Sequence, residues 1–475
     1  MNLSTDVDPT ERPTAVRYEV LALACSLSMI TYLDRVSFGA AGTLMAEDFG
    51  LATEGSLKGS YTAFAISYAL FEIPSGWWGD LRGPRRVLLR IVSWWSIFTI
   101  LTGLVGLRVA GVTLGGLGTL WIVRFLFGAG EAGAYPNIAR ALHNWFPAHE
   151  RGAAQGWVWM SGRLMGGLTP LVWMLLVSGT SLTAPLLHWR VAFCAFGLIG
   201  LAWIVVFAKR FVDRPEDHPC VNQAERTYIA AGRTIGVEFD HLRVPRRALF
   251  LNPRLWCLYL MYFCANYGWY FNITYFPGCL ETRFGTARDS LIGSLYKGGP
   301  LWLGAIGCLL GGYLTDRLLR GGMRRRWARR LPGMAGHFAS ASCCLAAAYS
   351  TSALGFSTLI AFSAFFNDLM MGGAWAICQD IGRKRTAVLS SCMNMAGGLG
   401  AACAGWISGS ILEHYLQAQA ELAGVDELRL SPQLRLAAQV NGNTANLLIY
   451  SAIYLTAALL WFGIDPEASL DDHNK

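Results

Sequence analysis

The sequence predicts an all-α membrane protein that crosses the bilayer about twelve times, and three observations lead to this fold class. Hydrophobic residues make up 53% of the 475 residues and charged residues 15%, whereas soluble domains carry roughly 25% charged residues. Apolar stretches of about 20 residues, the length of a transmembrane helix, recur along almost the entire chain. Lys and Arg lie between these stretches, so we interpret the net charge of +8 as membrane topology and not as a nucleic-acid surface.

The apolar stretches divide into two sets of six. The longest polar connection, 209–252, separates the sets, which predicts an N-terminal bundle (1–208), a central cytoplasmic loop and a C-terminal bundle (253–475). The predicted spans are 18–40, 58–78, 87–107, 120–139, 153–176, 189–208, 254–276, 291–314, 331–349, 354–378, 387–412 and 444–463.

Most basic residues lie on alternate connections, with four exceptions in predicted outer loops: Arg283, Arg288, Arg429 and Arg435. Three connections, 41–57, 178–188 and 350–353, contain no Lys or Arg. The opposite set contains the Arg82–Arg86 region, Lys209-Arg210, Arg324–Arg326 and Arg383–Arg385. Because basic loops stay in the cytoplasm, both termini are expected on the cytoplasmic side of a cell inner membrane.

A short glycine and acid pattern occurs once in each half. Gly76, Gly79-Asp80 and Arg82-Gly83 in the first half match Gly312 and Thr315-Asp316-Arg317 in the second, about half a chain later. This repetition predicts an internal duplication of six-helix units. Glycines allow helix ends to approach closely, and an aspartate can accept bonds from a helix N-terminus. We therefore predict gating loops that contain Gly76, Asp80, Gly83, Arg85, Arg86, Asp316 and Arg317.

The stretch from Gly76 to Arg86 resembles the loop signature of the major facilitator superfamily, although Leu81 stands where a basic residue is usual. Within that superfamily the chain is similar to the anion:cation symporter family, which carries sugar acids and other organic anions. Motifs in order along most of the chain carry this resemblance: Tyr32-Leu33-Asp34-Arg35, Arg124-Phe125 through Gly130-Glu131, Asn144-Trp145-Phe146-Pro147 and Arg214-Pro215. The resemblance implies two pseudo-symmetric six-helix bundles with alternating access.

Ionisable residues lie inside the predicted spans, where each charge costs at least about 2.5 kcal/mol, and we single out six of them as candidates. Asp34 and Arg35 are adjacent and therefore face different neighbours, because successive helical residues lie about 100° apart. Arg124 and Glu131 are seven residues apart and share one helix face. Arg163 and Lys297 complete the set.

A guanidinium matches a carboxylate with two parallel bonds, so Arg35 and Arg163, with Lys297, are candidates to bind a carboxylate substrate. The resemblance implies substrate binding for Arg35, proton coupling for Asp34 and Glu131, and a switching role for Arg124. The family's sugar-acid carriers have a neutral amide where this chain has Arg163, which indicates a substrate with a second acidic group or a different ion pair. The alternative is a set of fixed pairs, Asp34 with Arg124 and Glu131 with Arg163, with Lys297 reaching an interface.

Polar and aromatic residues in the spans are candidates to complete the substrate cavity, although each also suits helix packing. They are Tyr32, Tyr68, Tyr267, Tyr270, Trp375, Gln379 and Asn394.

These observations predict a secondary transporter that imports an organic anion, a sugar acid such as a hexuronate or aldonate, by proton symport. An aromatic carboxylate, an organophosphate, antiport, and a non-transporting sensor of the same fold are the alternatives. An enzyme is not expected, because the histidines are dispersed without metal or nucleophile–base spacing. We expect no cofactor and no metal, with protons and lipid as partners and a monomer as the default. The stretch 413–443 is long for an outer loop and receives no function.

Overall fold

The computed structural model describes residues 11–51, 57–109, 111–179, 184–231, 246–286, 291–426 and 429–467. The chain divides into two compact units. Unit 1 comprises 1–246, 375–391 and 467–475, and unit 2 comprises 247–374 and 392–466. The part of the central loop at 232–245 lies outside the described residues.

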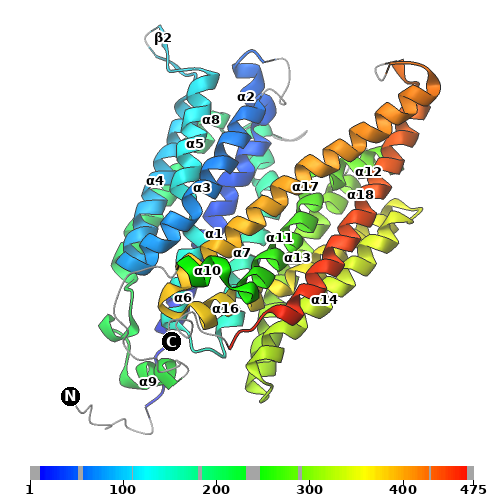
Figure 1. Ribbon diagram of the computed structural model, residues 1–475. Coiled ribbons are helices and arrows are strands. Elements are labelled where there is room, and N and C mark those ends of the chain that lie inside the picture. Colours follow the sequence, from blue (N-terminus) through cyan, green and yellow to red (C-terminus); the bar gives the residue numbers. More distant parts are fainter. Residues whose placement is uncertain are drawn as a thin grey trace. The chain divides into compact units, whose positions relative to one another are not determined.

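Unit 1 is a helical bundle in which α1 packs against α7, α3 against α5, and α4 against α8 (Figure 1). A two-residue antiparallel hairpin, β1 (Arg108–Val109) and β2 (Val112–Thr113), follows α4. Its helices are α1 (Val16–Ala40), α2 (Gly42–Asp48), α3 (Lys58–Arg82), α4 (Pro84–Leu104), α5 (Leu117–Glu131), α6 (Ala134–Trp145), α7 (Arg151–Trp173), which continues as the π-helix Met174–Ser178, α8 (Trp189–Arg210), the 3-10 turn Pro215–Asp217 and α9 (Gln223–Ala231).

Unit 2 repeats part of this pairing: α13 packs against α15, and α14 against α18 (Figure 1). These pairs join the second to the fourth and the third to the sixth span of that half, as α3·α5 and α4·α8 do in unit 1. Its helices, with those that cross into unit 1, are α10 (Arg246–Leu251), α11 (Pro253–Thr274), α12 (Phe276–Phe284), α13 (Leu291–Arg320), α14 (Arg325–Ala348), α15 (Ala353–Asp368), α16 (Met370–Gly382), the 3-10 turn Arg383–Arg385, α17 (Thr386–Ala423), α18 (Pro432–Leu460) and the 3-10 turn Trp461–Gly463.

Each of the twelve predicted spans coincides with a helix or with two consecutive helices, but three details of the prediction are wrong. The span 120–139 is broken into α5 and α6 by Gly133, whose φ of 84° is left-handed. The span 354–378 is broken between Asp368 and Met370. The stretch 413–443 is not a loop throughout, because α17 continues to Ala423 and α18 begins at Pro432.

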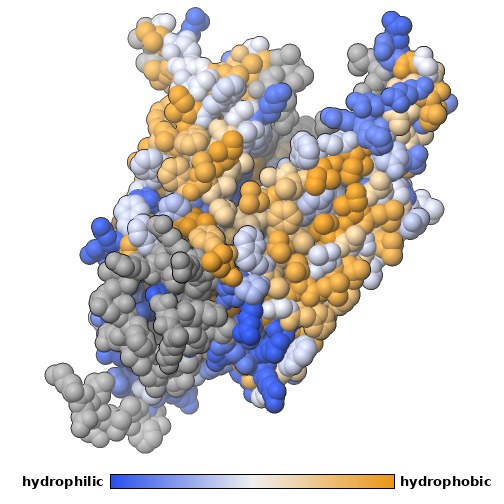
Figure 2. Space-filling view, viewed as in Figure 1, coloured by the Kyte–Doolittle hydropathy of each residue, from blue (hydrophilic) through white to orange (hydrophobic). Residues whose placement is uncertain are grey.

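Surface hydropathy fits a bilayer environment. Hydrophobic residues gather over the middle of the helices and hydrophilic residues over their ends (Figure 2). Six segments among the described residues have both the length and the hydropathy of a membrane span: Val16–Ala40, Pro84–Leu104, Arg151–Ser178, Trp189–Arg210, Ala353–Ala423 and Pro432–Gly463. Other helices fall short partly because they are broken, as α5 and α6 are, or contain charges, as α3 does.

The segment 375–391 belongs to unit 1 although it lies in the second half of the sequence. Its contacts explain this placement. Asp80 at the end of α3 accepts the backbone N–H groups of Ala387 and Val388 at 3.0 and 2.8 Å. Arg151 donates to Asp380 at 3.0 Å with both side chains buried. These charge-assisted bonds tie the start of α17 and the end of α16 to α3 and α7.

Helix α9 of the central loop caps the first span. The buried carboxylate of Glu225 accepts from the backbone N–H groups of Val16 and Arg17, and it pairs with the Arg17 guanidinium at 3.1 Å. Glu150, just before α7, pairs with the same guanidinium at 3.2 Å and accepts from the Tyr228 hydroxyl at 2.6 Å. Burial and the neighbouring Glu150 raise the pKa of Tyr228 to about 12. The first turn of α1, the start of α7 and α9 therefore form one polar junction.

Candidate functional site

An ion pair between a partly buried Arg35, whose side chain is 28% exposed, and a buried Glu131 joins the first span to the fourth. Nε of Arg35 donates to Oε1 of Glu131 at 2.6 Å, and the Glu131 side chain is 1% exposed. The second oxygen of Glu131 and Nη2 of Arg35 are buried and have no hydrogen-bond partner among the described residues. The guanidinium also lies 4.7 Å from the ring centre of Tyr68 on α3. The pair thus leaves one donor and one acceptor available to a bound group.

The adjacent acid faces a different helix, as the helical spacing predicts. Asp34 is buried, and its Oδ2 accepts from the hydroxyl of Thr99 on α4 at 3.3 Å. Arg124 is also buried and lies against the rings of Phe38, Phe64 and Phe127, with 4.1 Å to the ring centre of Phe38. Within the described residues no ion pair joins Asp34 to Arg124. The two nevertheless lie within electrostatic reach of one another.

A second guanidinium lies on α7. Arg163 is 4% exposed, and its Nη1 donates to the hydroxyl of Tyr32 on α1 at 2.9 Å. One turn before it, Trp159 stacks on Tyr135 of α6 with ring centres 4.3 Å apart and 9° between the planes. The alternative pairing of Glu131 with Arg163 is therefore wrong for this structure, because Glu131 bonds Arg35 instead.

Helix α16 adds two of the predicted residues to unit 1. The ring of Trp375 lies 5.3 Å from Trp159 and 6.3 Å from Tyr135. Gln379 follows one turn later on the same helix face, is fully buried, and has no bond to either amide atom among the described residues. A buried amide with two unsatisfied atoms is costly unless a ligand or water completes it. Trp375 and Gln379 therefore add an aromatic surface and an unsatisfied amide to the site.

Four predicted substrate residues belong to unit 2, and three have contacts there that suit structural roles. Tyr267 is 2% exposed and packs on Tyr450 at 5.4 Å. Tyr270 packs beside the same core. Lys297 donates to Glu281 of α12 at 2.9 Å, so its charge has an acidic neighbour inside unit 2. Asn394 is partly buried on α17.

The predicted gating loops have specific structural roles. A side chain at Gly76 would collide with Ser391 and the backbone of Ala387, which explains the glycine at this close approach. Gly83 has a φ of 84° and lies beside Asp213, whose carboxylate accepts the backbone N–H of Arg85 at 2.8 Å. Burial raises the pKa of Asp213, and the neighbouring Arg85 opposes that rise.

The remaining gating residues divide between paired and exposed. Asp80 pairs with Arg140 at 3.6 Å, and Asp316 of unit 2 pairs with Arg329 at 2.8 Å with both side chains buried. Arg86 and Arg317 are exposed.

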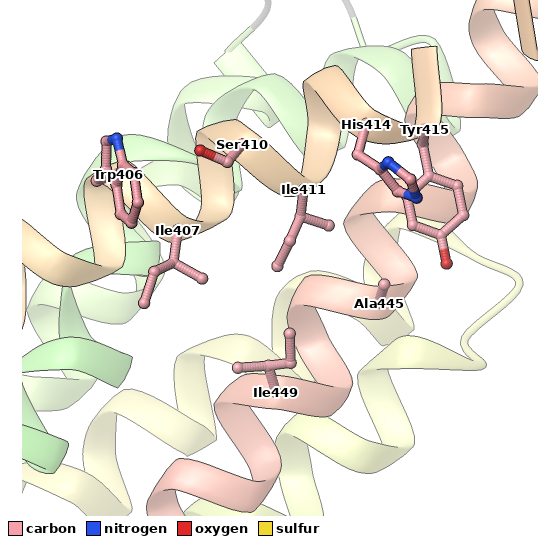
Figure 3. A pocket seen from close by; sticks show the side chains of 8 residues that line it. All are labelled: Trp406, Ile407, Ser410, Ile411, His414, Tyr415, Ala445 and Ile449. Atoms are coloured by element: carbon pink, nitrogen blue, oxygen red, sulfur yellow. The ribbon is translucent and has the colours of Figure 1, made fainter. Parts of the chain in front are cut away.

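An apolar cavity in unit 2 does not belong to this site. It has a volume of about 350 Å³ and lies between α17 and α18, where Ile407, Ile411 and Ile449 point into it and His414 and Tyr415 close one end (Figure 3). Its lining is almost wholly apolar and includes none of the charged candidates. An apolar groove cannot stabilise an anion, so we assign it no part in substrate binding.

Sequence reasoning missed three residues of the site. Tyr135 and Trp159 form the stacked wall beside Arg163, and their spacing of four residues from Glu131 and from Arg163 would have indicated them. Glu72 is a buried acid of unit 1 that lies inside the predicted second span. A carboxylate inside an apolar span is itself an indication of a functional residue, so the sequence could have identified Glu72.

Helices of membrane-spanning length with ionisable residues buried among them are typical of membrane proteins that move ions or polar substrates, secondary transporters among them. A family model, "Major Facilitator Superfamily", matches residues 24–405. A protein of Cupriavidus necator named "Probable sulfoacetate transporter SauU" is 31% identical over 84% of this chain and 87% of its own length. "Probable galactarate/D-glucarate transporter GudP" of Bacillus subtilis is 28% identical over 81% of this chain and 83% of its own.

Solved structures agree on the fold. The proton:xylose symporter XylE of the same superfamily matches with a TM-score of 0.69 at 14% identity, over 97% of this chain and 99% of that one. The chain belongs to the Major Facilitator Superfamily, among relatives that carry organic anions, and it is a multi-pass membrane transporter rather than an enzyme.

Proposed function

We propose that this transporter imports a small organic anion together with protons, by alternating access between the bundles 1–208 and 253–475. The observation that carries the proposal is the pair of the partly buried Arg35 with the buried Glu131, which leaves Nη2 of Arg35 without a hydrogen-bond partner among the described residues. An anion that binds this guanidinium competes with Glu131 for it. A carboxylate that loses its cation binds a proton more readily, so substrate and proton binding become linked.

The proposed substrate carries two anionic groups. Arg163 supplies a second guanidinium in unit 1, which is buried beside Tyr32 and Trp159. Trp159 in turn lies 5.3 Å from Trp375. Two guanidinium groups suit a molecule with two carboxylates, or with a carboxylate and a sulfonate. The names of two relatives, "Probable sulfoacetate transporter" and "Probable galactarate/D-glucarate transporter", specify such dianions. We therefore place these dianions ahead of the monoanionic hexuronates and aldonates that the sequence first indicated.

The proposed topology places both chain termini and the central loop 209–252 in the cytoplasm of an inner membrane. The described helix ends support this, because Arg82, Arg210 and the run Arg324–Arg326 all lie at one set of connections. A monomer is the proposed oligomeric state.

Two measurements test the proposed function. The first is a thermal-shift screen of the purified protein with sulfoacetate, galactarate, galactonate and benzoate at two pH values, because a true ligand stabilises the protein in proportion to its occupancy. We expect the two dianions to raise the unfolding midpoint most. The second is uptake into proteoliposomes with an imposed pH gradient. The proposal is contradicted if the uptake rate does not depend on the pH gradient, or if none of these anions raises the unfolding midpoint.

A further inference from the structure

The fourth span is broken two residues after Glu131, and an acid from another helix bonds the break. Helix α5 ends at Glu131, and α6 begins at Ala134. Oε2 of Glu72, in the middle of α3, accepts the backbone N–H of Gly133 at 3.0 Å, and the Glu72 side chain is fully buried.

This bond replaces one that an unbroken helix would make. In a continuous α-helix the N–H of Gly133 would donate to the carbonyl of Ala129, four residues earlier. Ala132 prevents that, because its ψ of 134° takes the chain out of the helix, and the freed N–H of Gly133 donates to Glu72. As the residue before the first turn of α6, Gly133 also places its N–H at the positive end of that helix, where a carboxylate is favoured.

Other groups fit the break closely. The amide of Asn137 donates to the carbonyl of Gly133 at 2.7 Å. A side chain at Gly133 would collide with Ser75, which lies one turn after Glu72 on α3 and accepts from Arg90 at 2.7 Å. Helix α3 therefore holds the break from one side, through Glu72 and Ser75.

The residues on the two sides of the break are site residues. Glu131, the last residue of α5, bonds Arg35. Tyr135, in the first turn of α6, bonds Ser28 at 3.0 Å and stacks on Trp159. The geometry of the break therefore sets the orientation of both side chains, Glu131 and Tyr135.

We infer that Glu72 is a positioning residue for the coupling acid: it holds the fourth span broken at Gly133 and so keeps Glu131 against Arg35. This inference rests on the proposed function only in that Glu131 is taken as the proton-coupling acid. The bond that it assigns to Glu72 has consequences that do not require transport.

The test compares Glu72→Gln with Glu72→Leu. Glutamine keeps a carbonyl oxygen of similar reach for the Gly133 N–H, whereas leucine has no acceptor. Ser352→Ala is the matched control, because it removes a helix cap of α15 in unit 2 that donates nothing to this site.

The first readout is labelling of Glu131 by a carbodiimide, measured by mass spectrometry on the purified protein. Carbodiimides react with protonated carboxyl groups and spare carboxylates held by a cation. We expect Glu72→Leu to raise labelling of Glu131 about tenfold, the factor that corresponds to the loss of one buried hydrogen bond. Glu72→Gln and Ser352→Ala should label as the unmodified protein does. Equal labelling in Glu72→Leu overturns the inference, whether or not the protein transports.

The second readout is uptake driven by a pH gradient, compared with anion exchange without a gradient. Glu72→Leu should lose gradient-driven accumulation and keep exchange, and Glu72→Gln should restore accumulation with an unchanged pH profile. If Glu72→Gln fails as Glu72→Leu does while its Glu131 labelling stays low, the charge of Glu72 matters and not its bond, and the inference is wrong. If the unmodified protein shows no gradient-driven uptake, the proposed function fails and the labelling still decides the inference.

Discussion

Arg35 on α1 and Glu131 on α5 form an ion pair through a single hydrogen bond, and the pair does not use all of its hydrogen-bonding groups. Nε of Arg35 bonds Oε1 of Glu131 at 2.6 Å, while Nη2 of the arginine and Oε2 of the glutamate have no partner among the described residues. A fixed structural pair would be expected to satisfy both of its buried edges, because unsatisfied buried charge is costly. The half-used pair is therefore suited to exchange partners.

The first prediction concerns the two acids. Asp34→Asn and Glu131→Gln should each abolish uptake driven by a pH gradient, because neither amide can carry the proton between the two sides. Exchange of internal for external anion should persist, since Arg35 remains in both variants. The measurement is paired uptake and exchange in proteoliposomes. Accumulation at the unmodified level in both variants would show that neither acid couples proton movement.

The second prediction concerns Arg163 and substrate charge. Arg163→Gln should weaken binding of a dianion such as sulfoacetate by roughly 1.5–3 kcal/mol, the range for a hydrogen bond to a charged group. A monoanion such as galactonate should lose much less, because it needs one guanidinium. Calorimetric titration of both anions measures the difference. Arg163→Lys keeps the charge without the planar guanidinium, so its affinity for the dianion should lie between those of the unmodified protein and of Arg163→Gln. Equal losses for both anions would assign Arg163 a structural role.

Sequence reasoning predicted the fold well because bilayer length, basic loops and internal repetition are properties of sequence segments. It also identified the buried charges Asp34, Glu131 and Arg163 and the partly buried Arg35 by their position in apolar spans. It did not identify which charges pair, because partners from different helices depend on how each helix is rotated. The fixed pair Glu131 with Arg163 was one of the pairings considered, and the structure instead joins Glu131 to Arg35.

The breaks in the fourth and tenth spans were not predicted for a related reason. Gly133 lies in a run that contains Gly128 and Gly130, so composition does not distinguish the glycine that adopts a positive φ from those that allow close packing. The distinction comes from Glu72, which is 61 residues away in sequence and accepts the freed N–H. Likewise, Glu225 caps α1 from the central loop, a contact that no local pattern indicates.

The third prediction concerns the gating loop. Asp80 accepts two backbone N–H groups at the start of α17, one on each carboxylate oxygen. An asparagine side chain has a single acceptor oxygen and carries no charge. Asp80→Asn should slow transport several-fold and cost about 0.5–2 kcal/mol of stability, the range for a helix cap. Substrate affinity should be unchanged, because Asp80 lies far along α3 from Tyr68. Transport rates and calorimetric titration separate the two effects, and a changed affinity would contradict this assignment.

The last prediction concerns the junction of α1, α7 and α9. Glu225 is fully buried and accepts from the backbone at Val16 and Arg17 and from the Arg17 side chain. Glu225→Ala leaves that guanidinium with Glu150 as its remaining carboxylate and leaves two backbone N–H groups without an acceptor, so we expect a loss of roughly 1–3 kcal/mol of stability. The unfolding midpoint in detergent measures it, with the exposed Asp217→Ala as the control on the same loop. Because α1 carries Asp34 and Arg35 and α7 carries Arg163, a loosened junction should also weaken anion binding. An unchanged midpoint would mean that the central loop rests on the bundle without stabilising it.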